Sequence, residues 1–173
     1  MNRRRAIKSF ILASGAILIM PSCIRQEGKA SIVLNNLNVS AEQEELLAEI
    51  VDTLIPPTDS PGAKELQLHL FVLKMVDDCH EESDQQDFMN GLSAINGSAR
   101  QYLGEPFVSS TQQKRESFLK VLELNEDVSK ELKSFYNIMK RRTIQGYLNS
   151  EYVMTNLVKY ELVPGRYNGY MPA

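Results

Sequence analysis

The sequence predicts an all-α fold: a single irregular bundle of five or six helices with an extended C-terminal arm rich in Pro, Gly and Tyr. Two observations support this. Apolar residues recur every three or four positions in several segments after residue 40, and residues that cap helices precede three of these segments. After residue 38, no segment alternates as a half-buried strand would. The chain has 173 residues, enough for one domain.

The first helix is expected to begin after Ser40. Residues 40–43 are Ser-Ala-Glu-Gln, a capping box in which the Ser hydroxyl accepts a bond from the third amide and the Gln reaches back. The apolar residues that follow share one helical face. They are Leu46, Leu47, Ile50, Val51 and Leu54. Two prolines at 56–57 end the helix, and residues 58–62 form a turn.

Further helices are expected along the rest of the domain. Ser60 can cap the first of them, and similar capping boxes are at 83–86 and 110–113. The helices are expected over about 61–79, after 83, after 110, over about 126–148 and, as a short last helix, over 150–157. The expected core residues are Leu66, Leu70, Leu73, Val76, Phe88, Leu92, Ile95, Ala99, Phe118, Leu119, Leu122, Val128, Leu132, Phe135, Met139 and Ile144.

The net charge of −3 conceals an uneven distribution. The first 22 residues contain four basic residues and no acidic residue, so the rest of the chain carries about −7. An acidic body argues against nucleic-acid binding, which needs a basic face. The two cysteines lie outside any CxxC pattern, which excludes a disulfide framework, a c-type haem and a zinc finger. No phosphate-binding glycine loop or GxSxG elbow occurs, so no FAD, NAD or ATP site is expected in this chain.

Residues 1–22 are expected to be an export signal, because a basic stretch precedes an apolar stretch too short to span a bilayer. The pair Arg3-Arg4 resembles a twin-arginine signal, although Ala6 is where such signals usually have Phe. An ordinary secretory signal is the alternative.

Residues 20–23, Met-Pro-Ser-Cys, resemble a lipobox, in which Cys23 would carry a diacylglycerol. The alternative is a plain cleavage site that leaves Cys23 a free thiol. Residues 23–39 are expected to form a tether with a short strand over 31–34, and residues 40–173 the helical domain. The expected location is the periplasmic side of a bacterial membrane, anchored by lipid.

Few side chains have the arrangement that catalysis requires. The densest polar cluster is residues 77–82, Asp-Asp-Cys-His-Glu-Glu, which could bind a metal ion. Adjacent helical residues point about 100° apart, so we expect a solvated helix end with Cys79 turned inward. His69 is expected to be a packed or surface residue. Glu151 and Glu161 would form a catalytic pair only if they faced each other across a cleft. We therefore expect no catalytic, cofactor-binding or metal-binding residues.

Four segments are more specific than the helices. They are the twin-arginine-like head, residues 46–63 (LLAEIVDTLIPPTDSPGA), residues 143–151 (TIQGYLNSE) and residues 163–169 (VPGRYNG). Together they resemble the gluconate 2-dehydrogenase subunit 3 family over about residues 40–173. The string Ile-Pro-x-Thr-Asp-x-Pro-Gly-Ala at 55–63 is the most specific part.

The resemblance implies a non-catalytic helical subunit. In that family a large partner of the glucose-methanol-choline type binds FAD and oxidises a sugar, a sugar acid or a related alcohol. The small subunit carries the export signal, the folded pair crosses the membrane together, and a cytochrome often accepts the electrons. Family tails often carry Cys after the last Gly of this segment, where this chain has Tyr170, so no role of that cysteine is carried over.

The partner interface is expected at the loop after the first helix and at the C-terminal arm, because both are rich in turns and the arm combines Arg with Tyr. The expected interface residues are Pro56, Thr58, Asp59, Pro61, Gly62, Tyr147, Pro164, Gly165, Arg166 and Tyr167. An arm packed back on its own domain is the alternative. For the whole chain, the alternatives are a stand-alone surface lipoprotein that binds a ligand or polymer, and a small enzyme.

Overall fold

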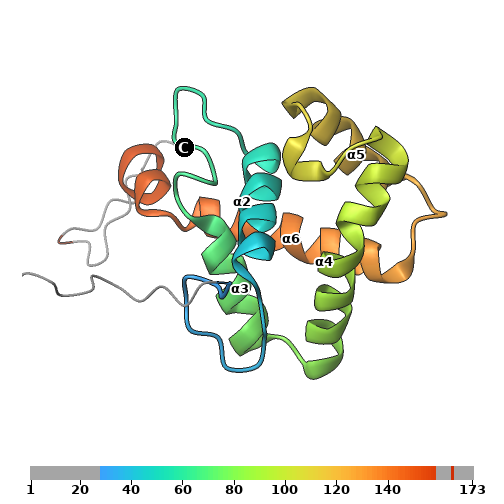
Figure 1. The fold of residues 1–173 in the computed structure, drawn as a ribbon. Helices are drawn as coiled ribbons and strands as arrows, with labels where there is room; N and C mark the ends of the chain where they lie inside the picture. Colours follow the sequence, from blue (N-terminus) through green and yellow to red (C-terminus); the bar gives the residue numbers. More distant parts are fainter. Residues whose placement is uncertain (1–27, 159–164, 166–173) are drawn as a thin grey trace, which may run out of the picture.

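The computed structural model describes residues 28–158 and Gly165, and it confirms the all-α fold (Figure 1). The α-helices are α2 (Ala41–Leu54), α3 (Leu68–Cys79), α4 (Glu82–Leu103), α5 (Gln112–Leu124) and α6 (Lys130–Leu148). A short 3-10 helix, η2 (Phe107–Ser109), precedes α5, and a π-helical turn, η3 (Val153–Leu157), follows α6. The described residues contain no β-strand. The predicted arm lies outside them, apart from Gly165.

Helix α6 lies in the middle of the bundle and contacts each of the other four α-helices (Figure 1). Its Phe135 ring is buried and lies 5.0 Å from the ring of Phe88 on α4. The two helices approach closely at Gly91, where a Cβ atom would overlap the Cβ of Phe135 and lie 2.7 Å from the Glu131 carbonyl oxygen. Position 91 therefore has room only for glycine.

The C-terminal half of α6 corrects one predicted core residue. Ile144 is 42% exposed, whereas Thr143 and Gly146 are buried. A Cβ atom at Gly146 would lie 2.7 Å from the ring of Phe71, so α6 and α3 approach closely here. Met139, Thr143 and Gly146 follow the helical period toward the core, which leaves Ile144 outside the core face.

The predicted start of the first helix is confirmed. Ser40 Oγ accepts a hydrogen bond from the Gln43 N–H at 3.1 Å, and Gln43 Oε1 accepts one from the Ser40 N–H at 3.0 Å. Both partners of this capping box lie within four residues, so the local sequence indicates it directly.

The helix predicted over 61–79 is wrong in its first third, because α3 begins at Leu68. Gly62 packs against the Pro57 ring, and Gln67 has a φ of 52°, in the left-handed region that interrupts a helix. The later start also changes the buried face. The buried residues of α3 are Leu68, His69, Val72, Leu73, Val76 and Asp77, while Leu66 and Leu70 are partly exposed.

The other two capping boxes are not formed as predicted. Helix α4 begins at Glu82, so Ser83 lies within its first turn. Thr111 is the N-cap residue of α5, and the Ser110 hydroxyl donates to the Pro106 carbonyl at 3.0 Å. Helix α6 begins later than predicted, after Ser129, whose Oγ accepts a bond from a first-turn amide at 3.4 Å. The Pro106 carbonyl thus competes for the Ser110 hydroxyl, and Ser129 supplies the side-chain cap of α6.

Two carboxylates bind the segment that precedes α2. Asp77 is 1% exposed and accepts hydrogen bonds from the backbone N–H groups of residues 35–37 at 2.7 to 3.0 Å. Glu44 accepts bonds from the backbone N–H of Ser31 at 2.5 Å and from its hydroxyl at 2.8 Å. The short strand predicted over 31–34 is wrong, because the chain bends here between the two carboxylates.

Backbone hydrogen bonds close this segment into a loop. The Ala41 N–H donates to the Gly28 carbonyl at 3.2 Å, and the Ala30 N–H donates to the Val39 carbonyl at 3.0 Å. Val39 is 3% exposed and belongs to the core. We call residues 28–40 the bridged loop.

Replacing Asp77 with asparagine is expected to lower the free energy of unfolding by about 2–3 kcal/mol at neutral pH, because bonds to a charged acceptor are lost. Burial raises the pKa of Asp77, but the three backbone donors and Lys74 outweigh burial and hold the pKa below its usual value. The stabilisation is therefore present above the usual aspartate range and is lost as the pH falls through the depressed pKa. Denaturant unfolding at several pH values should show wild type and variant converging in acid.

The matched control is Asp78→Asn, because Asp78 is exposed and pairs with Lys74 at the surface. This control should change the free energy of unfolding little. A difference between wild type and Asp77→Asn that stays constant with pH would contradict the assigned role.

Candidate partner interface

The loop after α2, residues 56–63, has a defined shape. The Thr58 N–H donates to the Ser60 carbonyl at 3.0 Å, and the Ala63 N–H donates to the Ile55 carbonyl at 2.9 Å. Beneath the loop, the contact between Gly62 and Pro57 leaves no space for a side chain at 62. The exposed residues of the loop are Pro56, Pro57, Thr58 and Asp59. The loop therefore presents a proline-rich surface of fixed conformation.

A hydrogen bond joins this loop to the end of α6. Ser60 Oγ and the Tyr147 hydroxyl lie 2.9 Å apart, and the Tyr147 side chain packs against the core. On the same helix, Ile144 and Leu148 are one turn apart and are 42% and 56% exposed. The hydrogen bond thus holds the loop beside this part of α6.

The turn η3 packs on α6 and adds to the exposed apolar surface. Val153 is 4% exposed, whereas Leu157 and Val158 are 62% and 57% exposed. Figure 1 shows η3, in red, on the same side of the bundle as the loop after α2, in teal. Seven large apolar side chains are exposed in the described part of the chain, and four of them lie within residues 144–158. We call these four, Ile144, Leu148, Leu157 and Val158, the apolar face.

The structure places Tyr147 beside the loop residues of the predicted interface. Pro61 is partly exposed and Gly62 is buried, while Tyr147 bonds to the loop through Ser60. Gly165 is exposed. The other predicted interface residues of the arm, Pro164, Arg166 and Tyr167, lie outside the described residues.

The apolar face was not predicted from the sequence. Ile144 is predicted in the core, and no role is predicted for Leu148, Leu157 or Val158. The one available signal was the spacing of four between Ile144 and Leu148, which places both on one stripe of a helix. The sequence does not show whether Ile144 and Leu148 face the core or the solvent. The structure shows that Thr143 and Gly146 face the core, so Ile144 and Leu148 lie on the exposed side of α6.

A cluster of charges joins the loop to the body of the bundle. Glu49 of α2 pairs with Arg115 of α5 and, at 2.5 Å, with Lys64, which follows the loop. Arg115 also donates to the carbonyls of Phe107 and Val108, at 3.0 and 2.5 Å. Burial raises the pKa of Glu49, but the hydrogen bonds and charges of the two cations outweigh burial and lower it. This cluster ties α2, η2, α5 and the end of the loop together.

The polar cluster at 77–82 does not converge on one point. Asp77 faces the bridged loop. Arg142 Nε donates to His80 Nε2 at 3.2 Å, so the ring proton of His80 is on Nδ1, 3.4 Å from Asp84. Cys79 is exposed, so the prediction that it turns inward is wrong; α3 ends at this residue and no further turn covers the thiol. Within residues 28–158, no three His, Cys, Asp or Glu side chains are grouped to hold a metal ion.

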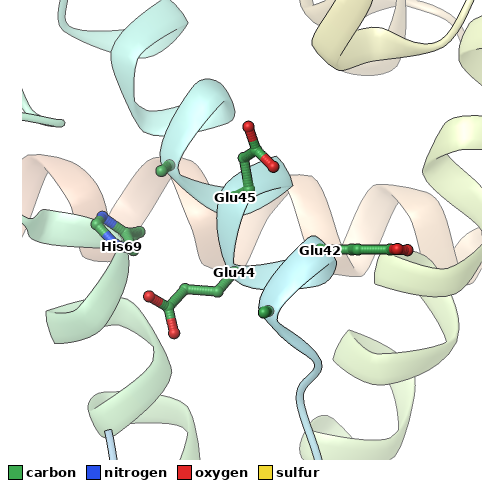
Figure 2. A pocket seen from close by; sticks show the side chains of 6 residues that line it. Glu42, Glu44, Glu45 and His69 are labelled. Carbon is green, nitrogen blue, oxygen red and sulfur yellow. The ribbon is translucent and has the colours of Figure 1, made fainter. Parts of the chain in front are cut away.

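An open hollow of about 420 Å³ beside α2 is lined by His69 and three glutamates (Figure 2). Glu44 lies on the side of His69 and accepts the hydrogen bonds of Ser31, whereas Glu42 and Glu45 point away from His69. Burial lowers the pKa of His69, against the opposing charge of Glu44. The Glu44 carboxylate is bonded to Ser31, and Glu42 and Glu45 point away from the His69 ring, so the hollow shows no converging set of polar side chains.

Four exposed apolar side chains near the end of α6 and an ordered proline-rich loop are features suited to binding another protein, because apolar surface that stays exposed in this way marks interaction sites. The family model described as gluconate 2-dehydrogenase subunit 3 matches residues 41–165, and the chain belongs to this family. The match confirms the resemblance found in the sequence. The family is a non-catalytic subunit of a multi-subunit dehydrogenase.

Neither a curated protein nor a solved structure matches the chain. In the part that the structure describes, every helix is too short or too polar to cross a membrane.

Proposed function

We propose that this chain is a non-catalytic accessory subunit that escorts, stabilises and anchors an FAD-dependent dehydrogenase of the glucose-methanol-choline type. The observation that carries the proposal is the family match over residues 41–165, which includes both the loop and the apolar face. In this proposal FAD is bound by the large partner, which oxidises a sugar, a sugar acid or a related alcohol. A cytochrome is the proposed electron acceptor.

Each part of the role is supported by a different region of the chain. The apolar face and the loop at 56–63 offer an exposed surface for the partner. Arg3 and Arg4 support export of the folded pair, and Cys23 supports a lipid anchor. These three residues lie outside the described part of the structure, so their roles are proposed from the sequence.

Co-expression with the large subunit tests the escort role. The flavoprotein is produced with the wild-type chain, with an Arg3→Lys/Arg4→Lys variant, and without the chain. We expect exported, flavin-loaded and active dehydrogenase only with the wild-type chain. A flavoprotein that is exported and active without the chain would show that the escort role is wrong. A stand-alone lipoprotein, by contrast, would purify from native membranes without a stoichiometric flavoprotein.

Replacing Cys23 with serine is expected to move the complex from the membrane fraction to the soluble fraction. Each buried CH₂ of an acyl chain stabilises membrane binding by ~0.8 kcal/mol, and this variant has no thiol at the lipobox position to acylate. Fractionation, with dehydrogenase activity measured in both fractions, checks the result. Activity should be retained, because Cys23 precedes the folded domain. A variant complex that remains on the membrane would refute the lipid anchor.

A further inference from the structure

The bridged loop determines where the amino-terminal segment joins the folded domain. Its two ends are bonded together, since the Ala41 N–H donates to the Gly28 carbonyl at 3.2 Å and Lys29 pairs with Ser40 in a β-bridge. The far side of the loop is bound to Asp77 through the amides of residues 35–37. The chain is therefore attached to the body at Gly28, beside the first residue of α2.

This attachment leaves a short linker behind the lipidation site. Five residues, 24–28, follow Cys23 up to and including the attachment point. Five residues reach at most about 18 Å when fully extended. If the loop were free, the linker would comprise residues 24–40 and reach about 60 Å. Bridging the loop thus shortens the reach about threefold.

We propose that the bridged loop keeps the N-terminal end of α2 within about 18 Å of a lipid bilayer, so that this end of the domain faces the membrane. The proposal rests on the lipid anchor at Cys23 in the proposed function. It adds a defined orientation: a freely tethered domain could turn any side toward the membrane, whereas this domain is held at one end.

The charges near the attachment point favour a tethered domain over an adsorbed one. Glu42 and Glu45 are exposed on the first turns of α2, and Glu44 lies between them in sequence. Anionic lipid surfaces attract basic segments and repel acidic ones. Lys29 at the attachment point offsets only one of the two exposed glutamates, so these charges do not favour adsorption of this end, and the lipid with its short linker must hold it there.

Energy transfer from Cys79 to the bilayer tests the orientation. Cys79 is exposed at the end of α3, and Cys23 is acylated, so a maleimide donor on the full lipidated chain labels a single site. The chain is bound to phosphatidylethanolamine–phosphatidylglycerol vesicles that contain an acceptor lipid. The same Gly-Ser spacer of ten residues, which adds at most about 36 Å, is inserted at one of two places. One place is between Gln26 and Glu27, before the attachment point, and the other is inside the loop before Val33, which is 84% exposed.

The spacer at 26–27 is expected to cause a loss of energy transfer, because it lengthens the linker. The identical spacer before Val33 should leave the transfer unchanged, because the bonds at the ends of the loop bypass it. Equal losses at both places, or no loss at either, would overturn the proposal.

Hydrogen exchange shows whether the loop is bound in each variant. The amides of residues 35–37 should be protected in the wild type and in both insertion variants, since Asp77 accepts their bonds. Exchange of these amides at the rate of an unfolded chain in the wild type would overturn the proposal. Failure of the lipid anchor gives a different result: vesicle binding would then be the same for wild type and Cys23→Ser, whatever the insertions do.

Discussion

Replacing Leu148 with glutamate is expected to weaken binding to the large dehydrogenase subunit by about 2 kcal/mol or more, ~30-fold in Kd. Leu148 is 56% exposed on the apolar face, one turn from Ile144. A carboxylate at this position would lie in the interface without a partner, and burying an unpaired charge is costly. Titration of the purified large subunit with wild-type and variant chains measures the change.

The matched control is Leu124→Glu. Leu124 is 79% exposed at the end of α5, outside the apolar face. Both variants should keep the wild-type Tm, because neither leucine belongs to the core. If Leu148→Glu binds as tightly as the wild type, the apolar face is not the interface. An equal loss from Leu124→Glu would show that the effect comes from added charge in general.

Replacing Gly91 with alanine is expected to destabilise the fold by about 2–3 kcal/mol, because the new Cβ would overlap Phe135 at the contact between α4 and α6. Backbone atoms of α6 also lie there, with the Glu131 carbonyl oxygen 2.7 Å away, so rotation of a side chain cannot relieve the overlap. The corresponding fall in Tm is about 5–10 °C for a domain of this size. Thermal unfolding followed by circular dichroism measures it.

Gly97 provides the matched control on the same helix. A Cβ atom at this position would meet nothing within 4 Å, and the residue is exposed. Gly97→Ala should therefore stabilise the domain by about 0.5–1 kcal/mol through helix propensity alone. If the two variants shifted Tm by the same amount, the close approach of α4 and α6 at Gly91 would not be the cause.

The sequence predicted the helices and the first capping box, which depend on residues close together in the chain, but local signals also misplaced the starts of α3, α4 and α5. Ser40 and Gln43 form their capping box, and Phe88, Leu92 and Ile95 are buried at the spacing of a helix. Prediction failed where a glycine or a polar residue occupies the core. Apolar periodicity selected Ile144, but the positions that face the core are Thr143 and Gly146, whose side chains give no hydrophobic signal.

Only the part of the candidate interface that is marked by neighbouring residues could be predicted from the sequence. The loop at 56–63 is marked by its own prolines and glycine, so the sequence indicates it directly. Its bond to α6 joins Ser60 to Tyr147, and no periodicity relates residues so far apart in the chain. The carboxylate of Asp77 likewise meets amides about forty residues earlier. In the sequence, Asp77 belongs to the polar cluster at 77–82. Only the packing of α3 shows that its carboxylate binds the backbone amides of residues 35–37.

The bond between Gly28 and Ala41 also decides how mechanical tension would enter the molecule. A pull on the residues before Gly28 passes through this bond and the Lys29–Ser40 pair into the first turn of α2. The remainder of the bridged loop lies outside this load path, so tension does not strip its amides from Asp77 while the bonds at its ends remain closed. Resistance to such a pull therefore depends first on a few backbone bonds and then on α2, whose buried leucines carry the load into the core.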